Sequence, residues 1–307
     1  MRLSMPRREF LRSAGAGAIA GVGLAGPGLA QAAYAAPDPN ATNSPRLLSG
    51  CCAYSYRKYL AHGPMTMEDF IRKGVELGID GVDMTGYWFK SMDPDYVYAL
   101  RHLAFKNGVE FSGAATGAST VQADAAKRAQ TLEEIKKWVD VTEMLGAPHL
   151  RIFAGKLPPG ATLDQGIAWT VEAMKAAADY AGKKGITLGL EDHSGITQNA
   201  DVCLEILHQV NSPYAGLNLD ITHFVPVPKA DAYAQIEAAI PFATHTHIRQ
   251  VFDNGEPIDM DRVWQMFARA GYKGYMSAEY EGKEEPETGV PKLIEQIKTL
   301  CRKYSTV

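Results

Sequence analysis

Four polar residues stand at the carboxyl ends of four successive apolar runs in the second half of the chain. They are Glu191, Asp220, His247 and Glu279. Two glutamates, one aspartate and one histidine offer mainly oxygen ligands, which suit a hard or borderline divalent cation. A lone residue of this kind is usually a strand end that faces water, so the recurrence is what favours a metal site. We predict one bound divalent ion, Mn²⁺ first, with Mg²⁺, Co²⁺ or Zn²⁺ as alternatives.

Eight short strand-like runs, separated by stretches of helical periodicity, carry these residues. A parallel sheet that closes on itself brings the carboxyl ends of all its strands to one face, where the four ligands would meet. The predicted strands are Leu47–Ala53, Gly81–Met84, Val109–Ala115, His149–Phe153, Ile186–Glu191, Ala215–Asp220, Thr244–Ile248 and Tyr275–Glu279. The clearest predicted helices are Ala125–Leu145, Thr170–Lys184 and Val290–Arg302.

This alternation predicts one α/β domain, a (β/α)8 TIM barrel, over residues 46–307. Its length is close to the roughly 250 residues that are typical of such barrels. Glycine follows several predicted helices, as in Leu77-Gly78-Ile79 and Lys106-Asn107-Gly108, which is typical of helix ends. A dinucleotide-binding fold is excluded because no G-x-G-x-x-G follows the first strand.

Four short segments resemble the xylose isomerase-like TIM-barrel superfamily of sugar isomerases and epimerases. They are Leu190-Glu191-Asp192-His193, Asp220-Ile221-Thr222-His223, His247-Ile248-Arg249 and the tail from Gly271 to Gly282. The resemblance covers nearly all of the chain after its first 45 residues. In the ketose 3-epimerases of that superfamily, Glu, Asp, His and Glu from these strands hold one Mn²⁺-like ion, and the two glutamates form the acid/base pair.

Carried over, the resemblance makes Glu191 and Glu279 the catalytic pair, and His223 and Arg249 contacts for substrate oxygens. We add His193, from the first motif, as a further substrate contact. Arg151 is added from the residues themselves, because an arginine inside an apolar run needs an anionic or oxygen-rich partner. That partner is either substrate or a salt bridge inside the barrel.

The chemistry explains why these residue types are needed. A proton on a carbon next to a carbonyl is very weakly acidic, and a cation that holds the carbonyl and a neighbouring hydroxyl stabilises the enediolate. One carboxylate takes the proton, and another acid returns one to a neighbouring atom or to the opposite face. The function expected is a metal-dependent isomerase or epimerase acting on a ketose or related small carbohydrate.

Two departures from the superfamily motif weaken any assignment of a particular substrate. Asp192 stands where many members have Asn, which would add a negative charge beside the metal, and Arg249 stands where many have Lys. His245 shares a strand face with His247, but only His247 is near enough to the strand end to be predicted as a ligand. Asp83, Tyr87 and Glu281 are further polar residues expected at the same rim.

Three other functions were weighed. A lyase or dehydratase, which would cleave a 3-keto-glycoside or dehydrate a keto-inositol, shares the first proton-abstraction step and stays as the alternative. A three-zinc DNA-repair endonuclease is rejected, because the second and third strands supply no histidine and the protein is acidic. A non-catalytic sugar-binding protein is disfavoured because both candidate acid/base glutamates are present.

The first 35 residues resemble a twin-arginine export signal. Arg7 and Arg8 precede an Ala/Gly-rich, weakly apolar stretch, and either Ala30-Gln31-Ala32 or Ala33-Tyr34-Ala35 fits a cleavage site. We expect residues 1–35 to be this signal, 36–45 a polar linker, and the product periplasmic or extracellular. The apolar stretch is too short and too rich in glycine to span a bilayer well.

The charge and the cysteines exclude other partners. The whole chain has a formal charge of −4, and removing residues 1–35 leaves 27 basic and 34 acidic residues, a charge of −7. An acidic surface offers no basic patch that would bind nucleic acid or an anionic membrane. No membrane span is expected after processing. Cys51, Cys52, Cys203 and Cys301 are expected to be free thiols, with a Cys203–Cys301 bridge as the alternative. The sequence leaves open a homo-oligomer and the identity of the sugar.

Overall fold

Eight parallel strands close into a barrel in the computed structural model of this chain, which describes residues 44–226 and 230–306. Each strand pairs with its sequence neighbours, and β8 pairs with β1 to close the ring. The strands are β1 (Arg46–Cys52), β2 (Gly81–Thr85), β3 (Glu110–Ser119), β4 (His149–Phe153), β5 (Thr187–Glu191), β6 (Ala215–Asp220), β7 (Ala243–Ile248) and β8 (Lys273–Ala278). The predicted (β/α)8 barrel is confirmed.

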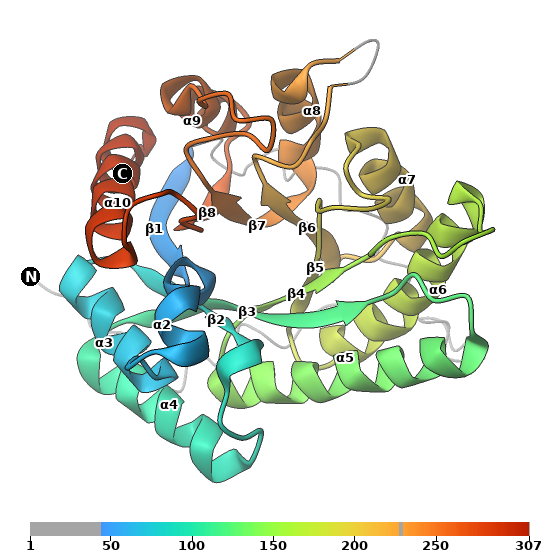
Figure 1. Ribbon diagram of the computed structural model, residues 1–307, viewed down its shortest axis with the longest axis horizontal. Helices are drawn as coiled ribbons and strands as arrows, with labels where there is room; N and C mark the ends of the chain where they lie inside the picture. The colour runs from blue at the N-terminus through green and yellow to red at the C-terminus, as the bar shows by residue number, and fades with distance from the viewer. Residues whose placement is uncertain (1–43, 227–229, 307) are drawn as a thin grey trace, which may run out of the picture. The chain divides into compact units, whose positions relative to one another are not determined.

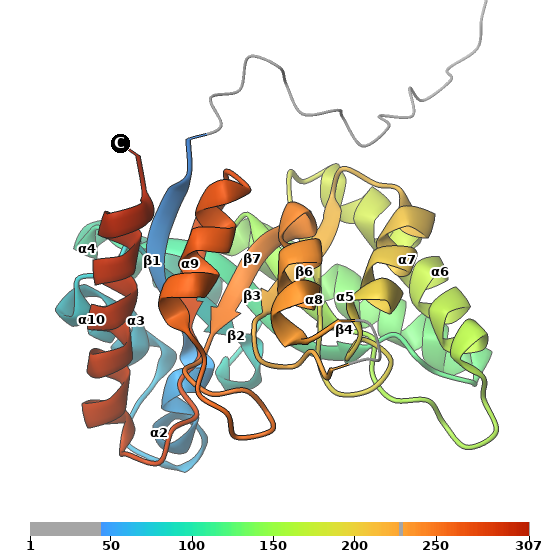
Figure 2. The same ribbon diagram turned by 90° about the horizontal axis from the view of Figure 1, so that it is seen from above.

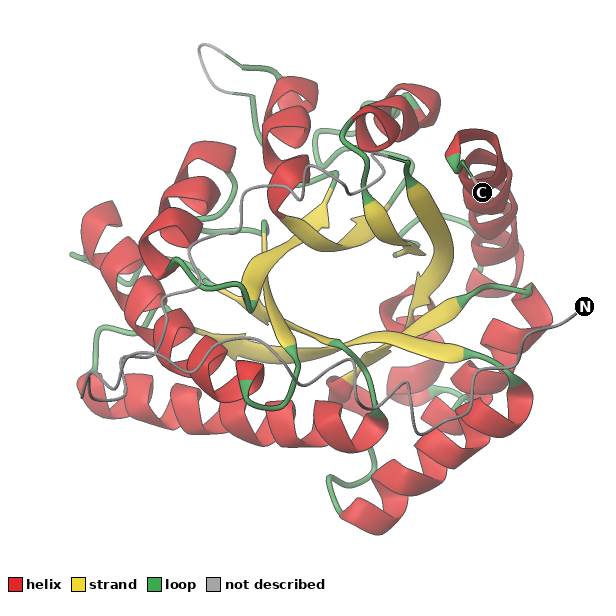
Figure 3. Ribbon diagram, turned by 180° about the vertical axis from the view of Figure 1, so that it is seen from behind, coloured by secondary structure: helices red, strands yellow, loops and turns green. Residues whose placement is uncertain are grey.

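Helices surround the ring of strands on its outside (Figure 1, Figure 3). The α-helices are α2 (Arg57–His62), α3 (Met67–Leu77), α4 (Pro94–Asn107), α5 (Ala125–Leu145), α6 (Leu163–Gly182), α7 (Ala200–Val210), α8 (Ala232–Ala239), α9 (Met260–Arg269) and α10 (Pro286–Tyr304). Short 3-10 helices are η1 (Ala53–Tyr56), η2 (Gly86–Trp88) and η3 (Ile240–Phe242). Successive helices pack on one another, as α6 does on α7 and α9 on α10 (Figure 2).

The helix ends follow local chemistry. Thr66 begins α3 with a capping box in which its side chain and that of Asp69 each bond the other's backbone N–H. Gly78 and Gly108 end α3 and α4 with positive φ angles of 59° and 66°, the left-handed conformation that glycine adopts most readily. Both glycines stand where the sequence predicted helix ends.

Several element boundaries differ from prediction, and helix α6 and strand β8 show the reasons. Helix α6 begins at Leu163, well before the predicted Thr170, because Thr162 and Gln165 form a capping box. Strand β8 begins at Lys273 because it pairs with β1 from Arg46 onward, and it ends at Ala278, so Glu279 is the first residue beyond the strand. Hydropathy alone does not reveal the pairing partner of a strand end.

Two predicted segments at the start of the chain lie wholly or mostly outside the described residues. These are the expected signal, residues 1–35, and the expected linker, residues 36–45. None of the helices among the described residues is long and apolar enough to cross a membrane. All four cysteines are buried and free, which confirms the prediction of free thiols over a Cys203–Cys301 bridge.

Candidate metal centre and active site

The barrel brings the four predicted ligands together at the carboxyl ends of β5 to β8. Glu191, Asp220, His247 and Glu279 each offer a ligand atom, and these atoms all lie within 4.8 Å of one another. All four side chains are buried. They come from consecutive strands because a closed parallel barrel places successive strand ends side by side on one rim.

His247 stands between the two glutamates. Its Nδ1 atom is 2.8 Å from Oε1 of Glu191 and 3.4 Å from Oε1 of Glu279, while Nε2 is 3.0 Å from Oδ2 of Asp83. Burial alone would lower the pKa of His247, but the negative groups around the ring, led by Glu279, raise it well above its usual value. When Nε2 donates to Asp83, the arrangement is the one in which a carboxylate orients a metal-binding histidine and leaves Nδ1 for the ion.

Arg151 is tied to Glu191 deep inside the barrel. Its Nε atom is 3.2 Å from Oε2 of Glu191, an ion pair that lacks the alignment of a hydrogen bond. Nη1 donates to the hydroxyl of Tyr87 at 3.2 Å and to the carbonyl of Thr116 at 3.0 Å. The partner that the sequence required for Arg151 is therefore a salt bridge, and it is made to a candidate catalytic carboxylate.

The two glutamates differ in proton affinity because their neighbours differ. Burial opposes ionisation of Glu191, but Arg151 and His247 outweigh it and lower the pKa of Glu191 to about 2. Burial raises the pKa of Glu279 to about 7, with His247 opposing and Glu191 adding to the rise. One carboxylate is held ionised while the other holds a proton more readily, which is the division of roles that acid/base chemistry requires.

A second group of charges surrounds Asp220. Nη2 of Arg249 lies 3.0 Å from Oδ2 of Asp220 and 2.7 Å from Nε2 of His223. Nδ1 of His223 is 2.7 Å from Oδ2 of Asp253, which lies beyond β7. The Thr222 hydroxyl donates to Oδ1 of Asp220 at 2.5 Å. The predicted substrate residues His223 and Arg249 are thus held against the centre, and Asp253 is a contact that the sequence did not indicate.

Asp192 is a neighbour of the centre, yet it faces the backbone. Its Oδ1 accepts from the backbone N–H of Asp220 at 2.8 Å. Burial and the adjacent Asp220 carboxylate raise the pKa of Asp192 well above its usual value. These surroundings disfavour the extra negative charge that the sequence led us to expect at this position.

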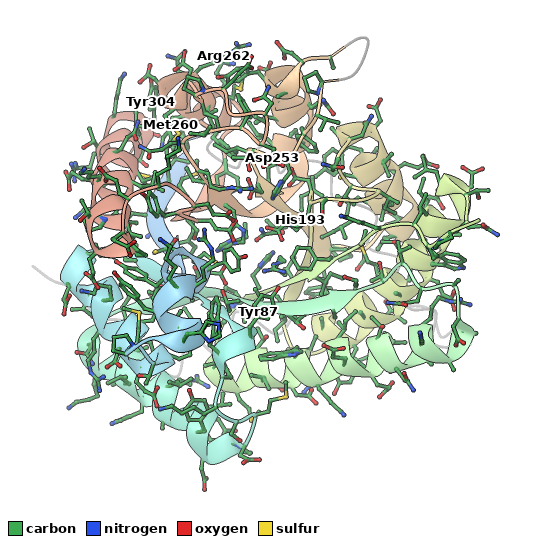
Figure 4. All side chains as sticks on the ribbon, viewed as in Figure 1. Tyr87, His193, Asp253, Met260, Arg262 and Tyr304 are labelled. Atoms are coloured by element: carbon green, nitrogen blue, oxygen red, sulfur yellow. The ribbon has the colours of Figure 1, made fainter. Side chains whose placement is uncertain are left out.

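The mouth of the site is marked by the side chains of Tyr87, His193 and Asp253, which lie around the central opening of the ring of strands (Figure 4). The ring of His193 lies 4.4 Å from that of His223 and 4.8 Å from that of Phe153, between centroids. Tyr87 is 45% exposed although its hydroxyl bonds Arg151. Met260, Arg262 and Tyr304 lie away from this opening (Figure 4).

A buried polar network supports Glu191 from the barrel interior. Nδ2 of Asn218 lies 3.4 Å from Oε1 of Glu191, and Nδ1 of His245 lies 3.1 Å from Oδ1 of Asn218. The hydroxyl of Ser112 is 3.2 Å from Nε2 of His245. Burial lowers the pKa of His245 to about 4, so its neutral ring donates through Nδ1 and accepts from Ser112. The sequence placed His245 on this face but gave no sign of its partners.

The residues present fit a divalent cation. Four buried carboxylates, those of Glu191, Asp220, Glu279 and Asp83, gather here with two arginines and with His247 and His223. Oδ1 of Asp83 has no hydrogen-bond partner among the described residues. An unpaired buried carboxylate oxygen is costly unless a cation lies close to it, and three carboxylates with one imidazole form a suitable donor set.

A single barrel with a carboxylate-rich centre at its carboxyl-end rim defines the class of this protein. The chain belongs to the xylose isomerase-like TIM barrel family, whose sequence model matches residues 71–300.

Among curated relatives, the chain is similar to a mouse protein named "Putative hydroxypyruvate isomerase". The two are 26% identical over 180 residues, which make up 53% of this chain and 65% of the mouse protein. The human protein of the same name is 23% identical over 180 residues. The similarity therefore spans less than two thirds of the length of these relatives.

Among solved structures, a D-allulose 3-epimerase from Methylomonas sp., in complex with D-allulose, is similar with a TM-score of 0.62 and 21% identity over 85% of this chain and 95% of that one. A "probable 3-DHS dehydratase" from Bacillus anthracis is similar with a TM-score of 0.65 and 16% identity over 82% of this chain and 98% of that one. At these identities the likeness shows the shared fold.

Proposed function

We propose that this protein is a divalent-metal-dependent sugar isomerase or epimerase that acts on a ketose or related small carbohydrate. The reaction begins with removal of a proton next to a carbonyl and passes through an enediolate. The observation that carries the proposal is a pair of buried glutamates, Glu191 and Glu279. Both carboxylates lie near Nδ1 of His247, and Glu191 also forms an ion pair with Arg151.

Glu191 and Glu279 share the proton transfers in this scheme. The Oε2 atom of Glu191 faces Arg151, which keeps that carboxylate ionised. Within the described residues, Glu279 forms no ion pair with an arginine, and burial raises its pKa to about 7, so it gives and takes back a proton more easily. Return of a proton to the neighbouring carbon or oxygen gives isomerisation, and return to the opposite face gives epimerisation.

The ion would be held by Glu191, Asp220, His247 and Glu279. When bound, it supplies Lewis-acid stabilisation of the negative charge that develops on the substrate oxygens. Arg249, His223 and His193 stand beside this set with hydrogen-bonding atoms suited to sugar hydroxyls. The names of the similar proteins support a small carbohydrate as substrate, because one is a D-allulose 3-epimerase and another carries the name of a hydroxypyruvate isomerase.

Elimination is the second candidate. Loss of a group from the carbon beyond the enediolate would make the protein a lyase or dehydratase for keto-sugars such as 3-keto-glycosides or keto-inositols. The fold that this chain shares with the Bacillus anthracis dehydratase supports elimination as a second candidate reaction. Both candidates need the same base, so the glutamate pair does not choose between them.

The test is a reaction in D₂O with a panel of unphosphorylated ketoses and 3-keto-glycosides, with products followed by NMR and mass spectrometry. We expect deuterium to enter the carbon next to the carbonyl while the carbon skeleton and oxygen count stay the same. Loss of water or of an aglycone would favour the second candidate instead. Metal-loaded protein that exchanges no deuterium into any member of the panel would contradict proton abstraction altogether.

A further inference from the structure

Cys52 ends strand β1 directly beside the proposed metal centre. It pairs with Asp83 in the sheet register, and its side chain is fully buried. Its Sγ atom lies 3.8 Å from Oε1 of Glu279 and 3.5 Å from the hydroxyl of Thr85. Cys52, Asp83 and His247 also form a group whose ligand atoms all lie within 4.8 Å of one another.

The spacing between Cys52 and Glu279 is that of two ligands of one ion. With metal–sulfur and metal–oxygen bonds of about 2.3 and 2.1 Å, two ligands at a tetrahedral angle stand about 3.6 Å apart. The observed distance from Sγ of Cys52 to Oε1 of Glu279 is 3.8 Å, and that from Nδ1 of His247 to the same oxygen is 3.4 Å. The sulfur, which donates a hydrogen bond to Glu279, thus lies at ligand spacing from one of the four predicted ligands and shares a candidate group with Asp83 and His247.

A second observation points to a cation on this side of the centre. Asp83 is 1% exposed, and its Oδ1 atom has no hydrogen-bond partner within the described ranges. An unpaired carboxylate oxygen is costly to bury unless positive charge lies close to it. Cys52 and Asp83 stand opposite each other at the ends of β1 and β2, so both side chains border the same part of the rim.

We propose that Cys52 is an additional, thiolate ligand of the metal centre and that it turns the selectivity of the centre toward thiophilic ions such as Co²⁺ and Zn²⁺. This rests on the proposed function for the existence of the centre. As the metal–sulfur bond forms, the thiol proton leaves to solvent, as in other cysteine-ligated sites. The four oxygen and nitrogen donors alone would suit Mn²⁺ or Mg²⁺, whereas thiolate sulfur favours softer ions.

Cys51 provides a matched control one residue away. It is equally buried, but successive strand residues point to opposite faces, and its Sγ atom faces the carbonyl of Cys52 at 3.6 Å. It belongs to none of the candidate ligand groups among the described residues. Cys51→Ser thus changes a buried thiol of β1 without touching the centre.

The experiment is a Co²⁺ titration of full-length, chelator-treated protein followed by absorption spectroscopy. Visible d–d bands report Co²⁺ bound to any protein donors, and a near-ultraviolet sulfur-to-cobalt charge-transfer band reports thiolate ligation. We expect both bands in the wild type and in Cys51→Ser, and only the visible bands in Cys52→Ser. In competition titrations, Cys52→Ser should weaken Cd²⁺ binding about 10- to 100-fold relative to Mn²⁺.

The outcomes separate this inference from the proposed function. Visible bands without a charge-transfer band in the wild type would leave the metal centre standing and overturn the role of Cys52. Absence of both bands would remove the centre itself and the inference with it. Absence of the charge-transfer band in the wild type decides by itself, whether or not Cys52→Ser folds. A band that is present in the wild type is assigned to Cys52 when it persists in Cys51→Ser and is lost in Cys52→Ser.

Discussion

At the scale of the residue, Glu191 and Glu279 are chemically identical side chains in unlike surroundings. Both carboxylates lie near Nδ1 of His247, but Glu191 has Arg151 at 3.2 Å, whereas Glu279 has the thiol of Cys52 at 3.8 Å. A buried carboxylate takes its protonation state from such neighbours rather than from its own chemistry. In the proposed reaction, this difference assigns the two residues separate tasks in proton transfer.

Replacing either glutamate by glutamine should abolish most turnover. Glu191→Gln and Glu279→Gln each remove a proton-transfer group and weaken a metal ligand, so kcat should fall by about 10²- to 10⁴-fold or more. Steady-state kinetics on the substrate found in the D₂O screen measures this. Glu134→Gln, an exposed change on α5, should leave kcat unchanged. If either active-site variant keeps more than about half of wild-type kcat, it is not part of the acid/base pair.

Arg151 should also be needed for stability when no ion is bound. Arg151→Met leaves the buried Glu191 without its counter-ion, and breaking a buried pair costs about 3–5 kcal/mol. Urea denaturation of chelator-treated protein measures the change in the free energy of unfolding. Arg72→Met breaks only an exposed pair with Asp69, worth about 0–1 kcal/mol, and serves as the control. Equal losses in the two variants would show that the Arg151 pair contributes nothing special.

The sequence indicated the chemistry-bearing residues at strand ends but not their partners. The four proposed ligands lie at consecutive strand ends, and a parallel barrel brings such ends together whatever the loops do. The contacts of Asp253, Asn218 and Cys52 were not predicted, because these residues meet partners that lie far away in the chain. Only the closed fold reveals which polar residue faces which.

At the scale of the element, some predicted bounds of strands and helices match the structure and others do not; helix α5, for example, has the predicted bounds Ala125–Leu145. The predicted bounds of β4 and β6 match residue for residue, because both are short apolar runs closed by a polar residue or a glycine-rich turn. Predicted strand β3 ended at Ala115, yet the strand continues to Ser119 through a register shift against β4. Irregular pairing of this kind leaves no periodic pattern in the sequence.

Because Gly189 in β5 has no side chain, it leaves room for the buried ring of His149. A Cβ atom there would overlap the ring of His149, which bonds the hydroxyl of Thr244 at 3.1 Å. Gly189→Ala should therefore destabilise the protein by about 1–3 kcal/mol, as overpacked cores do. Gly113→Ala, whose Cβ would come no closer than 3.3 Å to any neighbour, should cost less. Thermal denaturation compares them, and a larger loss for Gly113→Ala would contradict this reading of the interior.

At the scale of the whole molecule, the barrel serves as a rigid frame whose rim carries all the proposed chemistry. Closure through β1 and β8 brings Cys52, near the start of the described chain, beside Glu279, near its end. This meeting depends on the complete ring of strands. The similarity to the family covers residues 71–300, so β1 and its cysteine lie outside the matched region.

We propose that the protein acts outside the cytoplasm, on the strength of its twin arginines. Changing Arg7 and Arg8 to Lys should trap an unprocessed precursor in the cytoplasm, because the twin-arginine route requires the pair. Cell fractionation with immunoblotting measures processing and location. A parallel change of Arg101 and Arg128, both in the folded domain, should leave export in place. Unchanged processing after the change at Arg7 and Arg8 would mean that these residues do not form an export signal.

The most direct test of the central claim is metal analysis of catalytically active protein purified without chelator, alongside Asp220→Ala. The centre formed by Glu191, Asp220, His247 and Glu279 predicts about one divalent ion per wild-type chain and a large loss of ion in the variant. Activity should fall when a chelator removes the ion and return when a divalent ion is restored. Wild-type protein that turns over substrate with a metal content near zero would contradict the account.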